Sequence, residues 1–178
     1  MRRTLWVAMA LLGLIAATAG AQMPEMQGMQ MGQTARKPAP PAGPLKLTYG
    51  DQSAQWTAAT LAALPHSTIS VYNTHAKVNQ QYSGVPLIDL LAKIGVPDKP
   101  MGKQLRIYAV AVGSDGYEVV FSLGEIAPNV HDGSVLVADI EDGKPITDDG
   151  PLKLVVTGEK GPERWVRNLV AVRVLTAD

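Results

Sequence analysis

Three basic side chains and a tryptophan gather near the C-terminus, where they could bind an anion. The basic residues are Lys160, Arg164 and Arg167, and the tryptophan is Trp165. An arginine donates two parallel hydrogen bonds to a phosphate or carboxylate, so this cluster predicts an anion pocket. In the alternative interpretation, Trp165 packs in the core while the arginines pair with Glu159, with Glu163 or with solvent.

A cluster of methionines nearer the N-terminus offers a second kind of chemistry. Its members are Met23, Met26, Met29 and Met31, which lie among glutamines and glycines. Thioether sulfurs are soft ligands that suit copper(I), so the cluster predicts a copper site. The alternative is an uninvolved tail, because no histidine or cysteine within the cluster strengthens the metal interpretation.

The residue inventory excludes or disfavours several other chemistries. The chain has no cysteine, which excludes disulfides, thiolate metal sites and cysteine nucleophiles. The histidines, His66, His75 and His131, lack the short spacing of a zinc site. The carboxylates between Asp139 and Asp149 predict a solvated loop, since the spacing of an EF-type calcium loop is missing. Sixteen basic residues balance sixteen acidic ones, so nucleic acid is not an expected partner.

The first residues have the features of a secretory signal peptide. Two arginines precede an apolar stretch over residues 5–17, and the residues before Gln22 form a small-x-small cleavage pattern. The apolar stretch is shorter than the roughly 20 residues that span a bilayer, which favours cleavage over a membrane anchor. We therefore predict that residues 1–21 are removed and that the protein is periplasmic or secreted, with no membrane span after signal cleavage.

The rest of the chain divides into a linker and one domain. Residues 22–44 join the methionine cluster to a proline-rich run, and they predict a disordered linker with too little apolar surface to fold. Residues 45–178 have the usual size of a single domain.

Within this domain, predicted strands outnumber predicted helices. Apolar alternation and β-branched runs predict strands over residues 45–49, 68–72, 105–112, 117–121, 135–140, 152–157 and 170–175. Short helices are predicted after Thr57, from Pro86 to Gly95, and after Ser122. The predicted fold class is α+β, with a mixed, β-dominated sheet and short helices.

Five phrases of the domain have the order and spacing of a known family. They are residues 82–87 (YSGVPL), 115–117 (DGY), 121–125 (FSLGE), 150–155 (GPLKLV) and 164–167 (RWVR). Together they resemble the oxidoreductase molybdopterin-binding domain of the sulfite oxidase family, and the likeness extends from about residue 45 to residue 175. The resemblance implies the fold of that domain and a pocket for molybdopterin.

The resemblance also implies which residues would meet the cofactor. Catalytic members hold molybdenum through a cysteine a dozen or so residues before the Gly-Val-Pro-Leu phrase, a stretch that here contains Tyr72 and His75. The implied cofactor-binding residues are Tyr72, His75, Gly84, Lys160, Arg164 and Arg167. Neither a phenol nor an imidazole reproduces the soft donation of a thiolate, so the usual molybdenum centre cannot be assembled here and no catalytic residue is assigned.

Three functions remain open at this point. The first is an exported domain of this type that binds a pterin or another anionic ligand and is not catalytic alone. The second is a periplasmic, non-enzymatic interaction module that docks on a protein partner and has a copper-binding methionine tail. The third is a molybdenum oxidoreductase in which the dithiolene of the cofactor and non-cysteine groups hold the metal.

Overall fold

Strands dominate the part of the chain that the computed structural model describes, which comprises residues 43–74, 77–148 and 150–178. The predicted signal peptide, the methionine cluster and His75 lie outside the described residues. The described segments belong to one unit over residues 37–178. No helix in these segments is long and apolar enough to cross a membrane.

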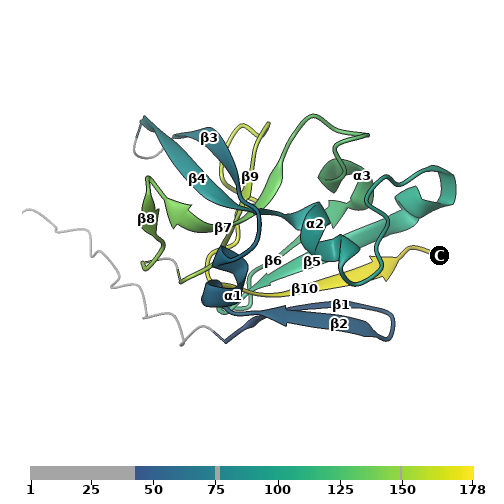
Figure 1. Cartoon of the computed structure of the whole chain (residues 1–178). Coiled ribbons are helices and arrows are strands. Elements are labelled where there is room, and N and C mark those ends of the chain that lie inside the picture. Colours follow the sequence, from purple (N-terminus) through teal and green to yellow (C-terminus); the bar gives the residue numbers. More distant parts are fainter. Residues whose placement is uncertain (1–42, 75–76, 149) are drawn as a thin grey trace, which may run out of the picture. The chain divides into compact units, whose positions relative to one another are not determined.

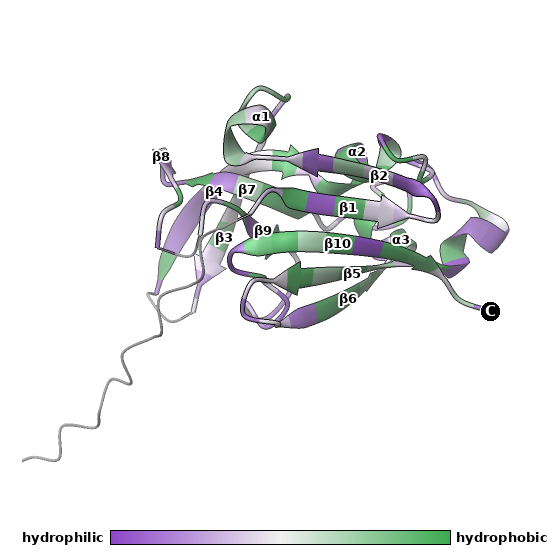
Figure 2. Ribbon diagram, turned by 90° about the horizontal axis from the view of Figure 1, so that it is seen from below, coloured by the Kyte–Doolittle hydropathy of each residue, from purple (hydrophilic) through white to green (hydrophobic). Residues whose placement is uncertain are grey.

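The first sheet has five strands in the order β2-β1-β10-β5-β6, seen side by side in Figure 2. Their bounds are β1 Leu45–Tyr49, β2 Gln52–Trp56, β5 Ile107–Gly113, β6 Glu118–Ser122 and β10 Leu169–Thr176. The first strand and the last strand of the domain pair in parallel, and the other neighbours pair antiparallel. The sheet is therefore mixed, as the sequence predicts.

The second sheet is antiparallel and has the order β3-β4-β7-β8, with β9 also paired to β7 (Figure 1). Its strands are β3 Ser67–Asn73, β4 Val78–Pro86, β7 Val135–Glu141, β8 Lys144–Pro145 and β9 Lys153–Val156. The register of β4 on β7 shifts between Ser83 and Gly84. A Cβ atom at Gly84 would lie 2.1 Å from the Val137 carbonyl oxygen, so this close approach requires glycine.

The helices are short; the three α-helices begin where the sequence predicts them, whereas the 3-10 helix was not predicted and covers the start of the strand predicted from residue 105. They are α1 Ala58–Ala62, α2 Leu87–Ala92, α3 Leu123–Ile126 and the 3-10 helix η1 Gly102–Arg106. The Thr57 side chain caps α1, and Gly95 follows α2 with a φ of 86°. Ser122 and Glu125 form the predicted capping box of α3, because each side chain accepts a hydrogen bond from the backbone N–H of the other.

Two hydrophobic clusters lie on opposite faces of the second sheet. The larger cluster joins both sheets and contains Leu47, Phe121 and Val137. The smaller one consists of Tyr82, Leu136, Ala138, Ile146 and Val155. Adjacent residues such as Leu136 and Val137 belong to different clusters, as expected for a strand buried on both faces. Trp165 is partly buried and packs against both clusters, so the second sheet holds the indole in place.

Three strands, β2, β4 and the two-residue β8, are absent from the sequence-based prediction. The first half of β4 is polar on both faces, with Asn79, Gln80 and Gln81 in succession, so it shows no alternation of apolar residues. β4 nevertheless lies between β3 and β7 in the second sheet.

Candidate functional site

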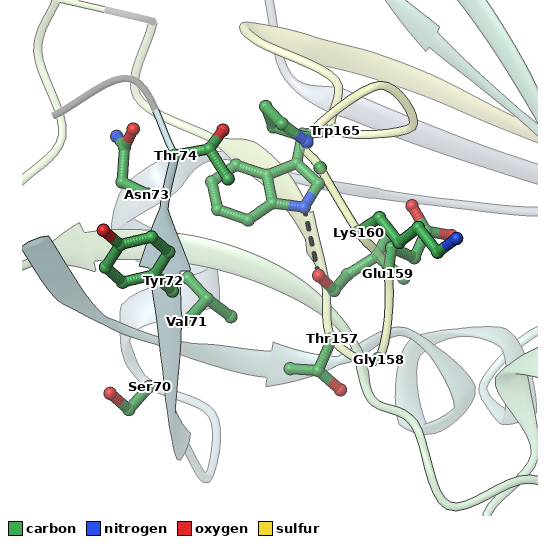
Figure 3. Close-up of a pocket in the computed structure, with 13 residues that line it drawn as sticks. Ser70, Val71, Tyr72, Asn73, Thr74, Thr157, Gly158, Glu159, Lys160 and Trp165 are labelled. Atoms are coloured by element: carbon green, nitrogen blue, oxygen red, sulfur yellow. Dashed lines mark hydrogen bonds between the residues drawn. The ribbon is translucent and has the colours of Figure 1, made fainter. Parts of the chain in front are cut away.

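A cavity of about 230 Å³ lies between β3 and the segment that follows β9 (Figure 3). Residues 70–74 line one side and residues 156–162 line the other. The indole N–H of Trp165 donates a hydrogen bond of 3.0 Å to the Val156 carbonyl, which fixes the ring as part of the wall. We name this space the Tyr72 cavity. Its charged lining residues are Glu159 and Lys160.

A second cavity, of about 380 Å³, shares Asn73, Pro162 and Trp165 with the first. Its charged lining residues are the cations Lys153 and Arg167 and the carboxylates Asp115, Glu141 and Glu163. We name it the Lys153 cavity. Its volume falls in the range of small-molecule sites, roughly 300–1,000 Å³. One tryptophan therefore borders two spaces of different charge and size.

Lys153 is buried at the base of the larger cavity, with 6% of its surface exposed. Its ammonium donates a hydrogen bond of 3.2 Å to the Tyr82 hydroxyl and lies 3.8 Å from a Glu141 carboxylate oxygen. The same nitrogen is 4.9 Å from the centre of the Tyr82 ring and 5.4 Å from that of Trp165. The two rings meet edge to face, 5.5 Å apart. Cation–π attraction and an ion pair thus offset the cost of burying this charge.

A hydrogen-bond network joins Lys153 to β3. The Tyr82 hydroxyl donates to a Glu141 oxygen at 2.9 Å, and the Gln80 amide donates to the same oxygen at 2.8 Å. The Asn73 amide in turn donates to the Gln80 carbonyl at 2.7 Å. The network crosses four strands, so it holds the β3 side of the two cavities and the Lys153 ammonium in one arrangement.

Arg164 lies outside these two cavities, on a third of about 80 Å³. Its guanidinium donates to Glu125 at 2.9 Å and to the Val120 carbonyl at 3.3 Å, and it pairs with Glu159 through two nitrogens. Its central carbon lies 4.5 Å from the centre of the Phe121 ring. For Arg164, the alternative interpretation of pairing with Glu159 is therefore confirmed.

These contacts shift the pKa of both ionised partners. Burial of Glu125 would raise its pKa, but hydrogen bonds from Ser122 and the Arg164 guanidinium outweigh burial and lower the pKa below the ordinary value near 4.5. Burial opposes the charge of Arg164, but hydrogen bonds to Glu159 and Glu125 raise its pKa above its ordinary value. Both groups are thereby held in their charged forms.

The structure brings only some of the predicted site residues together. Tyr72 and Lys160 line the Tyr72 cavity, whereas Arg167 lines the Lys153 cavity. Gly84 is on the wall of neither, since it lies between β4 and β7. His75 lies outside the described residues. The cofactor-binding role of this set stays a prediction.

Sequence reasoning missed the buried group around Lys153, including Tyr82 and Glu141. A signal was present, because Lys153 is a single charge within an otherwise apolar strand. Lysine is almost never fully buried without a partner, so its position implied a carboxylate or aromatic neighbour. Neither partner could be named from sequence, since Tyr82 is 71 residues away.

The acidic stretch is not one solvated loop, and for Asp139 that prediction is wrong. Asp139 is buried in β7, and its carboxylate contacts the Nε2 atom of His66 at 3.0 Å. The other ring nitrogen of His66 lies 2.7 Å from the Leu64 carbonyl.

His131 accepts a hydrogen bond from the Gly133 N–H. Among the described residues, no three His, Cys, Asp or Glu side chains are grouped to hold a metal ion.

A thiolate-held molybdenum does not fit these residues. The chain has no sulfhydryl, and the β3 residues of the Tyr72 cavity offer only hydroxyl and amide groups. Such hard oxygen and nitrogen atoms do not replace a soft sulfur ligand. The aromatic side chains of the lining can instead contact an organic ring, and its cations can pair with an acidic group.

No family model matches the chain, and no curated protein matches it. Among solved structures, the chain is similar to the sulfane dehydrogenase SoxCD from Paracoccus pantotrophus, with a TM-score of 0.56 and 21% sequence identity. The match covers 74% of this chain and 37% of that chain, so this chain spans little more than a third of that chain's length. The likeness shows the fold and does not confirm the sulfite oxidase family. The described domain thus has a fold similar to part of that dehydrogenase, in agreement with the predicted α+β, strand-dominated fold class.

Proposed function

We propose that the chain is an exported protein whose domain binds a pterin or another anionic ligand around Trp165 and is not catalytic alone. The observation that carries the proposal is the position of cations on both sides of one fixed indole. Lys160 lies in the Tyr72 cavity, and Lys153 and Arg167 lie in the Lys153 cavity. The oxidoreductase-like fold supports the proposal as well.

The lining favours a planar ligand with a small negative charge. Trp165 offers aromatic surface on which a ring system can stack. Lys160 and Arg167 can bind a phosphate or carboxylate group. Carboxylates such as Glu159 and Glu141 stand on the same walls, and they would repel a ligand of high negative charge. A pterin that carries one acidic group meets these requirements.

The lack of a thiolate is the reason for a non-catalytic role. By resemblance, the metal of the catalytic relatives depends on a cysteine, and this chain has none. Ligand binding needs only the cavities, the indole and the cations, all of which are present. The domain would then bind a ligand for storage, for sensing or for delivery to a partner.

Fluorescence titration with pterin-6-carboxylate tests the proposal. We expect the Lys160→Ala/Arg167→Ala double variant to lose about tenfold or more in affinity, since each cation can make a charge-assisted hydrogen bond. Arg173→Ala is the matched control, because Arg173 lies on β10 and pairs with Glu118 away from both cavities. Equal affinity of the double variant and the wild type would show that the cations do not bind the ligand.

Elemental analysis of protein from its own host separates the remaining alternatives. Molybdenum near one equivalent, with a redox-active centre, would favour an oxidoreductase with non-cysteine ligation. Protein without molybdenum and without affinity for the pterin would favour an interaction module with a protein partner. Mass spectrometry of the same preparation tests export, because signal cleavage places the mature N-terminus at Gln22.

A further inference from the structure

The Arg164 side chain has almost no hydrogen-bonding capacity left for a ligand. A guanidinium carries five N–H donors. The Nε atom of Arg164 and one terminal nitrogen contact the Glu159 carboxylate. The other terminal nitrogen donates hydrogen bonds to Glu125 and to the Val120 carbonyl. One N–H at most is free, so Arg164 cannot present two parallel donors to an anion while these contacts persist.

The partners of Arg164 come from three separate parts of the fold. Val120 lies in β6, Glu125 in α3, and Glu159 in the segment that follows β9. The guanidinium also covers the Phe121 ring of β6. Arg164 therefore ties its own segment to the first sheet and to α3.

The segment that Arg164 holds is also a wall of the proposed ligand site. Residues 158–162 line the Tyr72 cavity, and Glu163 lines the Lys153 cavity. Residues 158–164 form no strand; the Trp165 N–H donates to the Pro162 carbonyl within a turn, and the Tyr117 hydroxyl donates to the Glu163 carbonyl. A segment with few backbone bonds depends on side-chain contacts for its position.

We infer that Arg164 is a positioning residue, which closes residues 158–163 over the ligand site and does not itself contact the ligand. The inference rests on the proposed function for the identity of the site. Arg164 holds residues 158–163 in this position even when no ligand is bound. Its role can therefore be measured whether or not a pterin binds.

Two sets of variants test this role. Arg164→Ala removes the guanidinium, and Arg164→Lys keeps a charge that cannot span both carboxylates. In the Glu125→Gln/Glu159→Gln variant, both carboxylates lose their charge while the guanidinium stays. If Arg164 binds the ligand, this double variant frees the guanidinium and preserves or strengthens binding. If Arg164 positions the segment, the double variant weakens binding.

The first readout is amide hydrogen exchange of residues 158–165 in the free protein. We expect exchange about tenfold faster in Arg164→Ala and in the double variant, an intermediate rate in Arg164→Lys, and the wild-type rate in the control Arg173→Ala. Unchanged exchange in Arg164→Ala would overturn the inference. A global unfolding measurement on each variant shows that the change is local.

The second readout is the affinity for pterin-6-carboxylate. We expect the Glu125→Gln/Glu159→Gln variant to bind about fivefold to tenfold more weakly than the wild type, in parallel with its faster exchange. Tighter binding by Glu125→Gln alone, which leaves the Glu159 carboxylate of the cavity wall in place, would identify Arg164 as a ligand contact and overturn the inference. If the wild type does not bind the probe, the proposed function fails, and hydrogen exchange still decides the role of Arg164.

Discussion

The ammonium of Lys153 donates a hydrogen bond to the Tyr82 hydroxyl at 3.2 Å and lies 4.9 Å from the centre of the same ring. One side chain pair thus joins β9 to β4, which are separated in the sheet by β7. Because both residues are buried, the pair contributes to stability as well as to the wall of the Lys153 cavity.

Lys153→Met should destabilise the domain by about 1–3 kcal/mol, because it leaves the Glu141 carboxylate and the Tyr82 hydroxyl without their cation. Urea unfolding measures this loss. Lys160→Met is the control, since Lys160 is exposed and its loss should cost less than about 0.5 kcal/mol. A Lys153→Met/Glu141→Leu variant should recover part of the loss, because neither charged partner then remains. Equal stability of Lys153→Met and Lys160→Met would contradict the prediction.

Gly84→Ala should cost about 3 kcal/mol or more, or prevent folding. A Cβ atom there would lie 2.1 Å from the Val137 carbonyl oxygen and 2.5 Å from the Ala138 Cα atom, so the backbone of β4 or β7 must move. Gly124→Ala is the matched control, since its Cβ would meet nothing closer than 3.4 Å. Thermal unfolding of both variants checks the prediction. Similar melting temperatures would mean that the sheet accommodates the methyl group.

Much of the fold could be predicted from sequence because its signals are local. The capping box of Ser122 and Glu125 and the alternation of Leu45 and Leu47 each involve residues close in the chain. β4 could not be predicted in this way, because its polar first half has no apolar alternation and is held in the sheet by backbone pairing with β3 and β7. Arg164 was assigned to an anion by residue type, but its partner Glu125 is 39 residues away and approaches only in the folded chain.

If the methionine cluster binds copper(I), as the sequence predicts, deletion of residues 22–33 should abolish copper(I) binding by the chain that starts at Gln22. The four methionines of this segment are the soft ligands that the sequence offers to copper(I). Competition with a chromophoric copper(I) chelator compares the mature chain with the shortened one. Equal copper binding by the two chains would assign the metal to the domain and remove the role of the tail.

Stability should fall with acidification more steeply in the wild type than in Glu125→Gln. Hydrogen bonds from Ser122 and Arg164 hold the pKa of folded Glu125 below the ordinary value near 4.5. Between these two values the unfolded chain binds more protons than the folded chain, so unfolding becomes easier as the pH falls. The contribution of Glu125 is thus present above pH about 4.5 and is lost towards its folded-state pKa.

Thermal unfolding midpoints between pH 6 and pH about 3 measure this dependence. Glu125→Gln keeps the size of the side chain and removes the proton-binding group, so its midpoint should change less over this interval. Glu118→Gln, in the exposed pair with Arg173, should keep the wild-type slope, because surface ion pairs contribute little. If Glu125→Gln and the wild type show the same slope, the charge on Glu125 does not stabilise the fold, and the contacts of Arg164 with Val120 and Glu159 suffice to hold the segment.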